Sequence, residues 1–283
     1  SVYIAEAQRL GIAVRPPHVN FSGGHFTLVY EESQPLMNTD EHRFLRIIEE
    51  SRTQIFADER RFSQSQIREN PSDPLNLCPS VPVLYMGLGQ VRELTSRTAE
   101  RIVAERTAAP FADLRDFLLR VEPQPKELNH LIRCGGLDGL GASRAGLLQE
   151  AAELRRSGHA GQMGFGFLGG DVAAESAAER LAWETELLGQ PVSVHPVALV
   201  LRPPDCVALA DLPSQPGKPV TVVGVRLPGW TGGKGFFLDD GTGYVVVQGE
   251  GMPTPKPWQV VTLRGRWQVD AWGGGVLGIE ASL

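Results

Sequence analysis

The arrangement of apolar residues changes at Pro219, and this change constrains the fold more than any other feature of the sequence. From there to the end, short runs rich in valine and aromatic residues alternate with glycine-containing turns. Five such runs in so short a stretch are typical of a small closed barrel rather than a two-sheet sandwich. The predicted strands are residues 220–227, 235–239, 244–248, 260–269 and 275–281.

Before Pro219 the sequence is mostly helical in pattern. Apolar residues recur at helical spacing from residue 83 to residue 156, and Thr95 or Ser96 is a suitable N-cap. We predict helices over residues 95–106, 112–120, 126–134, 143–156 and 175–188. The predicted fold class is therefore α+β and multidomain, with an α-helical helix-hairpin-helix domain followed by a five-stranded OB-type β-barrel. The expected parts are residues 1–80, 81–160, 161–218 and 219–283.

The N-terminal part is less regular. Residues 2–10 predict an amphipathic helix that ends at Gly11, because glycine readily adopts the left-handed conformation found after helices. Prolines favour extended chain over residues 15–20, and residues 24–30 alternate like a strand. Residues 31–80 carry a predicted helix over 40–52 and a proline-rich loop. Because the chain starts without methionine inside an apparent helix, we expect a piece of a longer protein.

Two glycine-rich turns are the first candidate binding sites. A glycine turn between two helices leaves N–H groups unpaired at the start of the second helix. The positive end of the helix dipole lies there too, so a phosphate is favoured. One turn alone favours a purely structural connection, whereas two in tandem fit contact with a nucleic-acid backbone equally well. The predicted DNA-binding residues of these turns are Gly87, Leu88, Gly89, Gln90, Gly139 and Gly141.

The barrel provides the second candidate surface. OB-type barrels hold nucleic acid by stacking bases on aromatic side chains beside basic ones. We predict contacts from Trp230 and Lys234, in the glycine-rich loop after the first strand, and from Arg264 and Arg266. Alternating aromatic residues also fill the core of a small barrel, and this is the preferred interpretation for the aromatic residues within strands.

Charge and motif content exclude several functional classes. The net charge of -6 argues against a simple basic nucleic-acid binder, so any DNA contact depends on local geometry. The three cysteines are far apart, which supports neither a zinc site nor a disulfide framework. No apolar stretch approaches the ~20 residues of a membrane helix. Asp239 and Asp240 precede a glycine and fit a turn better than a pair of metal ligands. We predict no catalytic residue, no metal and no cofactor in this chain.

Several longer motifs occur in a specific order. They are YIAEAQRLGI at 3–12, PPHVNFS at 16–22, GLGQV at 87–91, LIRCGGLD at 131–138, ETELLG at 184–189 and SVHP at 193–196. Together they resemble the bacterial DNA polymerase III alpha subunit family, over most of the chain. The resemblance implies the end of a fingers domain, then a helix-hairpin-helix domain, then an OB-fold. Residues 31–80 depart from the family pattern as an insertion.

The resemblance also implies roles. Residues 87–90 are expected to hold the backbone of duplex DNA, and the barrel to approach single-stranded template. A further motif falls where the family binds its sliding clamp, although Gly164 and Gly166 loosen it; read alone, it also fits a linker. Its residues are Gln162, Met163, Phe165 and Phe167. The family's palm domain, with its catalytic aspartates and Mg²⁺, has no counterpart in this sequence, so no activity is expected from this chain alone.

The expected function is that of a DNA-binding, processivity-conferring C-terminal part of a replicative or error-prone DNA polymerase alpha subunit. The expected partners are DNA, the sliding clamp and the rest of the polymerase holoenzyme, in the cytoplasm and with no membrane. Two alternatives stay open at this point. One is a standalone helix-hairpin-helix and OB DNA-binding protein of repair or recombination, and the other is a scaffold that binds only protein.

Overall fold

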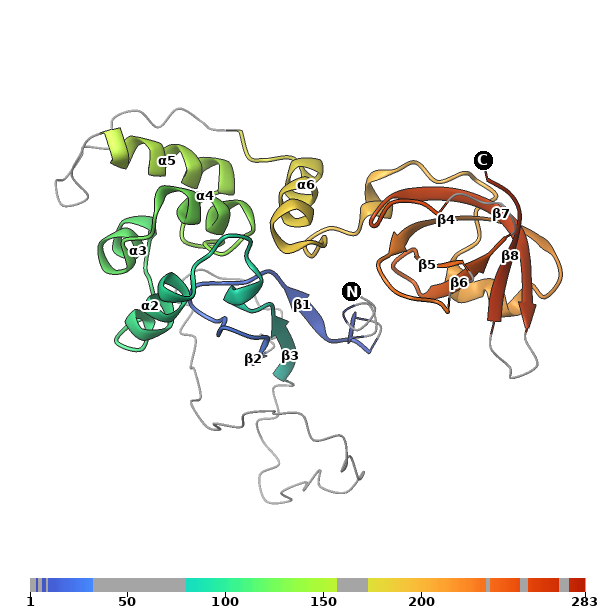
Figure 1. Cartoon of the computed structure of the whole chain (residues 1–283), viewed down its shortest axis with the longest axis horizontal. Coiled ribbons are helices and arrows are strands. Elements are labelled where there is room, and N and C mark those ends of the chain that lie inside the picture. Colours follow the sequence, from blue (N-terminus) through green and yellow to red (C-terminus); the bar gives the residue numbers. More distant parts are fainter. Residues whose placement is uncertain are drawn as a thin grey trace, which may run out of the picture. The chain divides into compact units, whose positions relative to one another are not determined.

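The computed structural model describes residues 4, 7–8, 10–32, 80–156, 173–232, 235–249, 254–269 and 275–282 (Figure 1). The predicted helix at 40–52 and the clamp-motif residues Gln162, Met163, Phe165 and Phe167 lie outside these ranges. No helix in the part of the chain that the structure describes is long and apolar enough to cross a membrane.

The helical region follows the predicted helices closely. Its elements are α2 (Ser96–Arg106), α3 (Leu114–Val121), α4 (Pro125–Arg133), α5 (Arg144–Arg156) and α6 (Ala177–Leu188). Polar caps define their starts, because the side chains of Thr95, Asp113 and Ser176 each accept a hydrogen bond from an N–H group of the first helical turn. One core of leucine, isoleucine, valine and phenylalanine side chains joins the helices, with Leu187 bringing in α6. All five predicted helices are confirmed.

The N-terminal part forms a three-stranded sheet in the order β1-β3-β2. Its strands are β1 (Ala13–Arg15), β2 (Thr27–Glu32) and β3 (Ser80–Tyr85), and β1 pairs with β3 in parallel. Residues 83–85 therefore belong to a strand, and the prediction that the helical region begins at residue 83 was wrong. Gly11 has a φ of 82° and its N–H donates to the carbonyl of Gln8, which confirms the predicted helix end there.

The PPHVNFS segment anchors this N-terminal part to the helices. The Asn20 side-chain amide donates to the carbonyl of Phe111 and accepts from its N–H, at 2.9 and 2.8 Å. His18 Nε2 lies 2.7 Å from the carbonyl oxygen of Asp138, and Arg106 donates to the carbonyls of Val19 and Ser22. Burial lowers the pKa of His18, because loss of hydration outweighs the hydrogen bond to Asp138. The ring is therefore neutral at pH 7.

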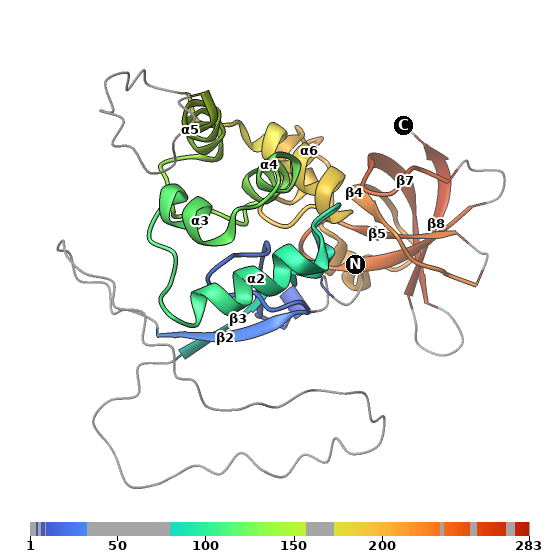
Figure 2. The same ribbon diagram turned by 60° about the vertical axis from the view of Figure 1, so that its left-hand side comes forward.

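The C-terminal part is a barrel (Figure 2). It is closed, with strand order β4-β5-β6-β8-β7. Its strands are β4 (Pro219–Leu227), β5 (Phe236–Asp239), β6 (Tyr244–Gln248), β7 (Val260–Val269) and β8 (Gly275–Ser282). β6 and β8 pair in parallel, and the other neighbours are antiparallel. All five predicted strands and the OB-type fold class are confirmed.

Side chains along the barrel strands alternate between the core and the surface, as the sequence pattern predicts. Phe236 and Trp267 are buried in the core, and the Trp267 ring fills the space that a Cβ at Gly275 would need. Asp239 and Asp240 accept hydrogen bonds from the N–H groups of Gly241 and Thr242, which confirms the turn interpretation. A connector packs against the barrel through two 3₁₀ turns, η2 (Pro196–Leu199) and η3 (Leu209–Ser214).

Candidate nucleic-acid interface

Three of the four N–H groups of the Gly87–Gln90 loop, those of Leu88, Gly89 and Gln90, are already paired within the protein. It follows strand β3 and enters a 3₁₀ turn, η1 (Leu88–Gln90), instead of joining two long helices. The N–H of Leu88 donates to the carbonyl of Gly23 at 2.8 Å, and that of Gly89 to the carbonyl of Gly24 at 3.1 Å. The N–H of Gln90 donates to the carbonyl of Gly87. The argument from free N–H groups therefore fails at Leu88, Gly89 and Gln90, and the DNA contact predicted at residues 87–90 stays a prediction.

Packing within the protein explains why residue 87 is glycine. A Cβ placed there would lie 2.5 Å from the carbonyl oxygen of Gly24 and 2.6 Å from the carbonyl carbon of His25. The close approach that glycine permits is thus made by the protein's own backbone. Gly87 and Leu88 are buried, while Gly89 and Gln90 are exposed, so only the latter two keep a surface for any DNA contact.

The required geometry, a tight turn that leads directly into the start of a helix, is found between η1 and α2, beginning five residues after Gly87. Glu93 has a φ of 60°, the left-handed conformation of a tight turn between helices, and Thr95 caps α2. Within the described residues, the N–H groups of Ser96 and Arg97 donate to no acceptor, and both residues are exposed. They are the free donors of a helix N-terminus on the surface. The sequence predicted a cap at Thr95 or Ser96 and free N–H groups at the start of the following helix, but the contact was assigned to the glycines before it, and the turn at Glu93 contains no glycine.

A buried carboxylate holds this turn in place. Glu127 on α4 accepts hydrogen bonds from the N–H and hydroxyl of Thr95, at 3.0 and 2.7 Å, and from the hydroxyl of Thr98 at 2.9 Å. It also accepts from the N–H of Gln124, which completes a capping box at the start of α4. Burial alone raises the pKa of Glu127, but these hydrogen bonds outweigh it and lower the pKa below its usual value. The turn is therefore fixed before any ligand arrives.

The charged side chains around the turn are mainly basic, and two of them have no acidic partner among the described residues. Arg92 and Arg97 are exposed, and their guanidinium groups bind no acid among the described residues. Lys126 lies 2.5 Å from the Glu93 carboxylate and neutralises it. Arg101, which lies on α2 like Arg97, is already paired with Glu122 at 3.1 Å. The surface therefore presents two cations and two N–H groups that have no partner among the described residues, which is a suitable arrangement for phosphate.

The second glycine turn, between α4 and α5, is occupied differently. Gly139 and Gly141 are exposed, and Gly139 has a φ of 86°. At the start of α5, however, the N–H of Ala145 already donates to a carboxylate oxygen of Glu175 at 3.1 Å, and the Ser143 hydroxyl accepts from the N–H of Gly146. An internal carboxylate thus takes the place that a phosphate would need there. The DNA contact predicted at Gly139 and Gly141 stays a prediction.

A buried arginine joins this second turn to α6. Arg144 forms two hydrogen bonds with Asp138, at 2.9 and 2.7 Å, and one with Glu184 at 3.0 Å. Glu184 also accepts from the N–H groups of Val192 and Ser193 and from the Ser193 hydroxyl. The ETELLG and SVHP motifs are thus part of one internal charge network, a role that sequence reasoning did not foresee.

Among the barrel residues predicted to contact DNA, those that the structure describes lie on the outside of the barrel. Arg264 and Arg266 are exposed on β7, and Arg266 donates to the carbonyl of Gly217 at 2.9 Å. Trp230 is 85% exposed, which is exceptional for a tryptophan and leaves its ring open to stacking. Lys234 lies outside the described residues.

Comparison with known proteins supports the resemblance. Residues 11–147 match the family model described as "Helix-hairpin-helix motif". The DNA polymerase III subunit alpha of Thermus aquaticus is 29% identical over 280 residues, which covers 87% of this chain and 18% of that protein. The error-prone DNA polymerase of Aromatoleum aromaticum is 30% identical over 192 residues, covering 60% of this chain and 17% of that protein. The chain spans less than a fifth of the length of these relatives.

Proposed function

From the premise that this chain is related to the C-terminal region of bacterial DNA polymerase III alpha subunits and error-prone DNA polymerases, we propose that it holds DNA for a DNA-synthesising enzyme. The primary contact in this proposal is the turn of residues 92–97, which binds the backbone of duplex DNA irrespective of base sequence. Nucleotidyl transfer and its Mg²⁺ belong to a palm domain, for which this sequence has no candidate residues.

The observation that carries the proposal is a group of four donors at this turn that have no partner in the part of the chain that the structure describes. The N–H groups of Ser96 and Arg97 lie at the positive end of the α2 dipole, and the guanidinium groups of Arg92 and Arg97 provide charge. Main-chain donors and arginines both bind phosphate oxygens and carry no base information by themselves. Such a surface suits a protein that has to hold any sequence.

The test is a salt titration of duplex binding by the full chain. Replacing Arg92 and Arg97 together by alanine is expected to weaken binding equally for unrelated duplexes. It is also expected to reduce the slope of log K against log salt by about 1.8, since each phosphate contact contributes about 0.9. The matched control is Arg101→Ala, which removes an arginine from the same helix but one already paired with Glu122. Equal affinity and slope for the double variant and the control would refute the proposed site.

The barrel contributes a second contact in the proposal, to single-stranded DNA. Its support is the open Trp230 ring and the exposed cations on β7. Stacking of a base on an aromatic side chain is worth about 1–3 kcal/mol, so Trp230→Ala is expected to weaken oligonucleotide binding by about tenfold or more. The fluorescence anisotropy of a labelled oligothymidine measures this binding for both chains, and an unchanged dissociation constant would remove Trp230 from the interface.

Binding of a sliding clamp completes the proposal. It rests on the sequence of the segment that contains Gln162 and Phe165 and on the position of this segment in the family that the chain resembles. Retention of the full chain on immobilised clamp is the direct assay. Gln162→Ala with Phe165→Ala is expected to abolish retention while leaving duplex binding unchanged, and retention of this variant at the wild-type level would contradict the clamp role.

A further inference from the structure

The backbone of Arg92 is held by the protein on both sides. Its N–H donates to the carbonyl of Leu187 at 2.9 Å, and its carbonyl oxygen lies 2.7 Å from Nδ1 of His130. Leu187 lies in the last turn of α6, where carbonyls have no partner within the helix itself. Because both backbone groups of Arg92 are bound, its freedom is confined to the exposed side chain.

His130 of α4 is the side chain that binds the carbonyl of Arg92. A carbonyl oxygen only accepts hydrogen bonds, so Nδ1 of His130 carries the hydrogen in this contact. The residue is 9% exposed, and the surrounding protein shields the hydrogen bond from competing water. Loss of this donor leaves the carbonyl of Arg92 with no other partner among the described residues.

One face of α4 holds both ends of the turn of residues 92–97. Glu127 and His130 are three residues apart in the helix, so their side chains lie on the same face. Glu127 accepts from the N–H and hydroxyl of Thr95, while His130 binds the carbonyl of Arg92. Glu93, with its left-handed conformation, lies between these two anchored residues. The shape of the turn is therefore imposed by α4.

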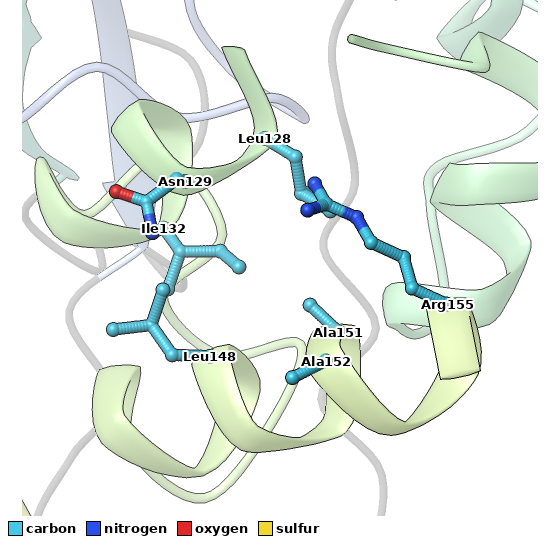
Figure 3. A pocket seen from close by; sticks show the side chains of 7 residues that line it. All are labelled: Leu128, Asn129, Ile132, Leu148, Ala151, Ala152 and Arg155. Atoms are coloured by element: carbon cyan, nitrogen blue, oxygen red, sulfur yellow. The ribbon is translucent and has the colours of Figure 1, made fainter. Parts of the chain in front are cut away.

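Another face of α4 packs against α5. Leu128 and Ile132 of α4 line a small apolar pocket of about 110 Å³ together with Leu148 and Ala151 of α5. Figure 3 shows Ile132 and Leu148 facing each other across this pocket. The lining of the pocket includes no residue of the turn. A change at Ile132 therefore alters the packing of the same helix away from Arg92.

We propose that His130 is a positioning residue of the DNA site: its Nδ1–H fixes the carbonyl of Arg92 and so keeps the arginine in place beside the start of α2 for binding a phosphate. This inference rests on the proposed function, because it assigns what orients one of the phosphate-binding side chains. The buried ring of His130 itself does not contact DNA. Without its hydrogen bond, a fraction of the molecules has Arg92 misplaced, and the apparent affinity falls in proportion to the competent fraction that is left.

Anisotropy titrations of a labelled duplex with the full chain, at several salt concentrations, test the proposal. His130→Leu removes the donor and is expected to weaken binding by about two- to tenfold, the factor that one net hydrogen bond sets. The slope of log K against log salt is expected to stay the same, because Arg92 still reaches its phosphate in the bound state. His130→Asn is expected to restore the affinity, since its amide nitrogen is attached to Cγ as Nδ1 is. The matched control is Ile132→Val, which is expected to bind like the wild type.

The hydrogen bond also has a spectroscopic signature that needs no variant. In ¹⁵N NMR spectra of the wild-type chain, Nδ1 of His130 is expected to carry a hydrogen, as donation to a carbonyl requires. An Nδ1 without hydrogen would overturn the proposal, even if His130→Leu fails to fold. Circular dichroism of each variant at the assay temperature establishes which of them are folded.

The Arg92→Ala background separates failure of this inference from failure of the proposed function. Arg92→Ala alone is expected to weaken binding and to reduce the salt slope by about 0.9; no effect would refute Arg92 as a DNA contact and with it the proposed function. In that background, His130→Leu is expected to change the affinity no further. If His130→Leu weakens binding by the same factor with and without Arg92, or if Ile132→Val weakens it equally, His130 does not act through Arg92, and only this inference is overturned.

Discussion

Removal of the buried Arg144 charge is expected to destabilise the helical region strongly. The side chains of Arg144 and Glu184 are 2% and 0% exposed, and their nearest charged atoms are 3.0 Å apart. At that distance the gross attraction is about 5 kcal/mol for an effective dielectric constant of about 20. Loss of one partner leaves the other charge buried, and this costs about 3–5 kcal/mol. In the variant, Glu184 still accepts hydrogen bonds from the N–H groups of Val192 and Ser193. We therefore expect Arg144→Met to lower the free energy of unfolding by about 3–4 kcal/mol.

The assay is urea unfolding followed by circular dichroism at 222 nm, which reports mainly on the helices. The matched control is Arg101→Met, whose ion pair with Glu122 is 39% and 69% exposed and is worth below about 1 kcal/mol. In a double-mutant cycle, Arg144→Met combined with Glu184→Gln is expected to cost less than the sum of the two changes. A loss for Arg144→Met within about 1 kcal/mol of that for the control would refute the reasoning.

Three further predictions concern packing, protonation and thiol chemistry. Gly87→Ala is expected to lower the free energy of unfolding by about 1–3 kcal/mol, because its Cβ would collide with the backbone of Gly24; chemical denaturation measures the loss. Burial lowers the folded-state pKa of His18, so the unfolded chain takes up its proton first. Stability should fall as the pH drops below about 6.5, and His18→Gln should reduce this slope in unfolding curves recorded against pH. Burial raises the pKa of the Cys134 thiol to about 12, so peptide mapping after iodoacetamide treatment at pH 8 should find Cys134 unmodified in the folded chain, whereas rapid labelling would contradict its burial.

The helices and barrel strands were predictable because their signals are local. Apolar spacing and cap residues such as Thr95 define α2 without reference to the rest of the chain, and valine-rich alternation defines the barrel strands. The sheet of β1 and β3 was not predictable, because Ala13 pairs with Val83 across a stretch whose prolines indicate only a loop. The residues of a three-residue strand such as β1 do not show which distant segment it pairs with.

The candidate site was misplaced for a similar reason. A glycine pair such as Gly87 and Gly89 indicates that some backbone approaches closely, but the spacing cannot say whether that backbone belongs to DNA or to the protein. Here it belongs to the protein, at Gly24. Conversely, Glu93 adopts the left-handed conformation without being glycine, so the turn that leaves N–H groups free has no glycine signature.

The residues that make this sequence recognisable are therefore mostly residues that hold it together. His18 and Asn20 bind the helices, Glu184 binds Arg144, and Gly87 packs against Gly24, all inside the protein. A buried polar contact tolerates few substitutions because its loss leaves an unpaired group, whereas a surface arginine that binds phosphate can shift along a helix and still reach its ligand. Resemblance to a family thus establishes the scaffold first, and the proposed DNA contact of this chain has to be tested at its exposed donors.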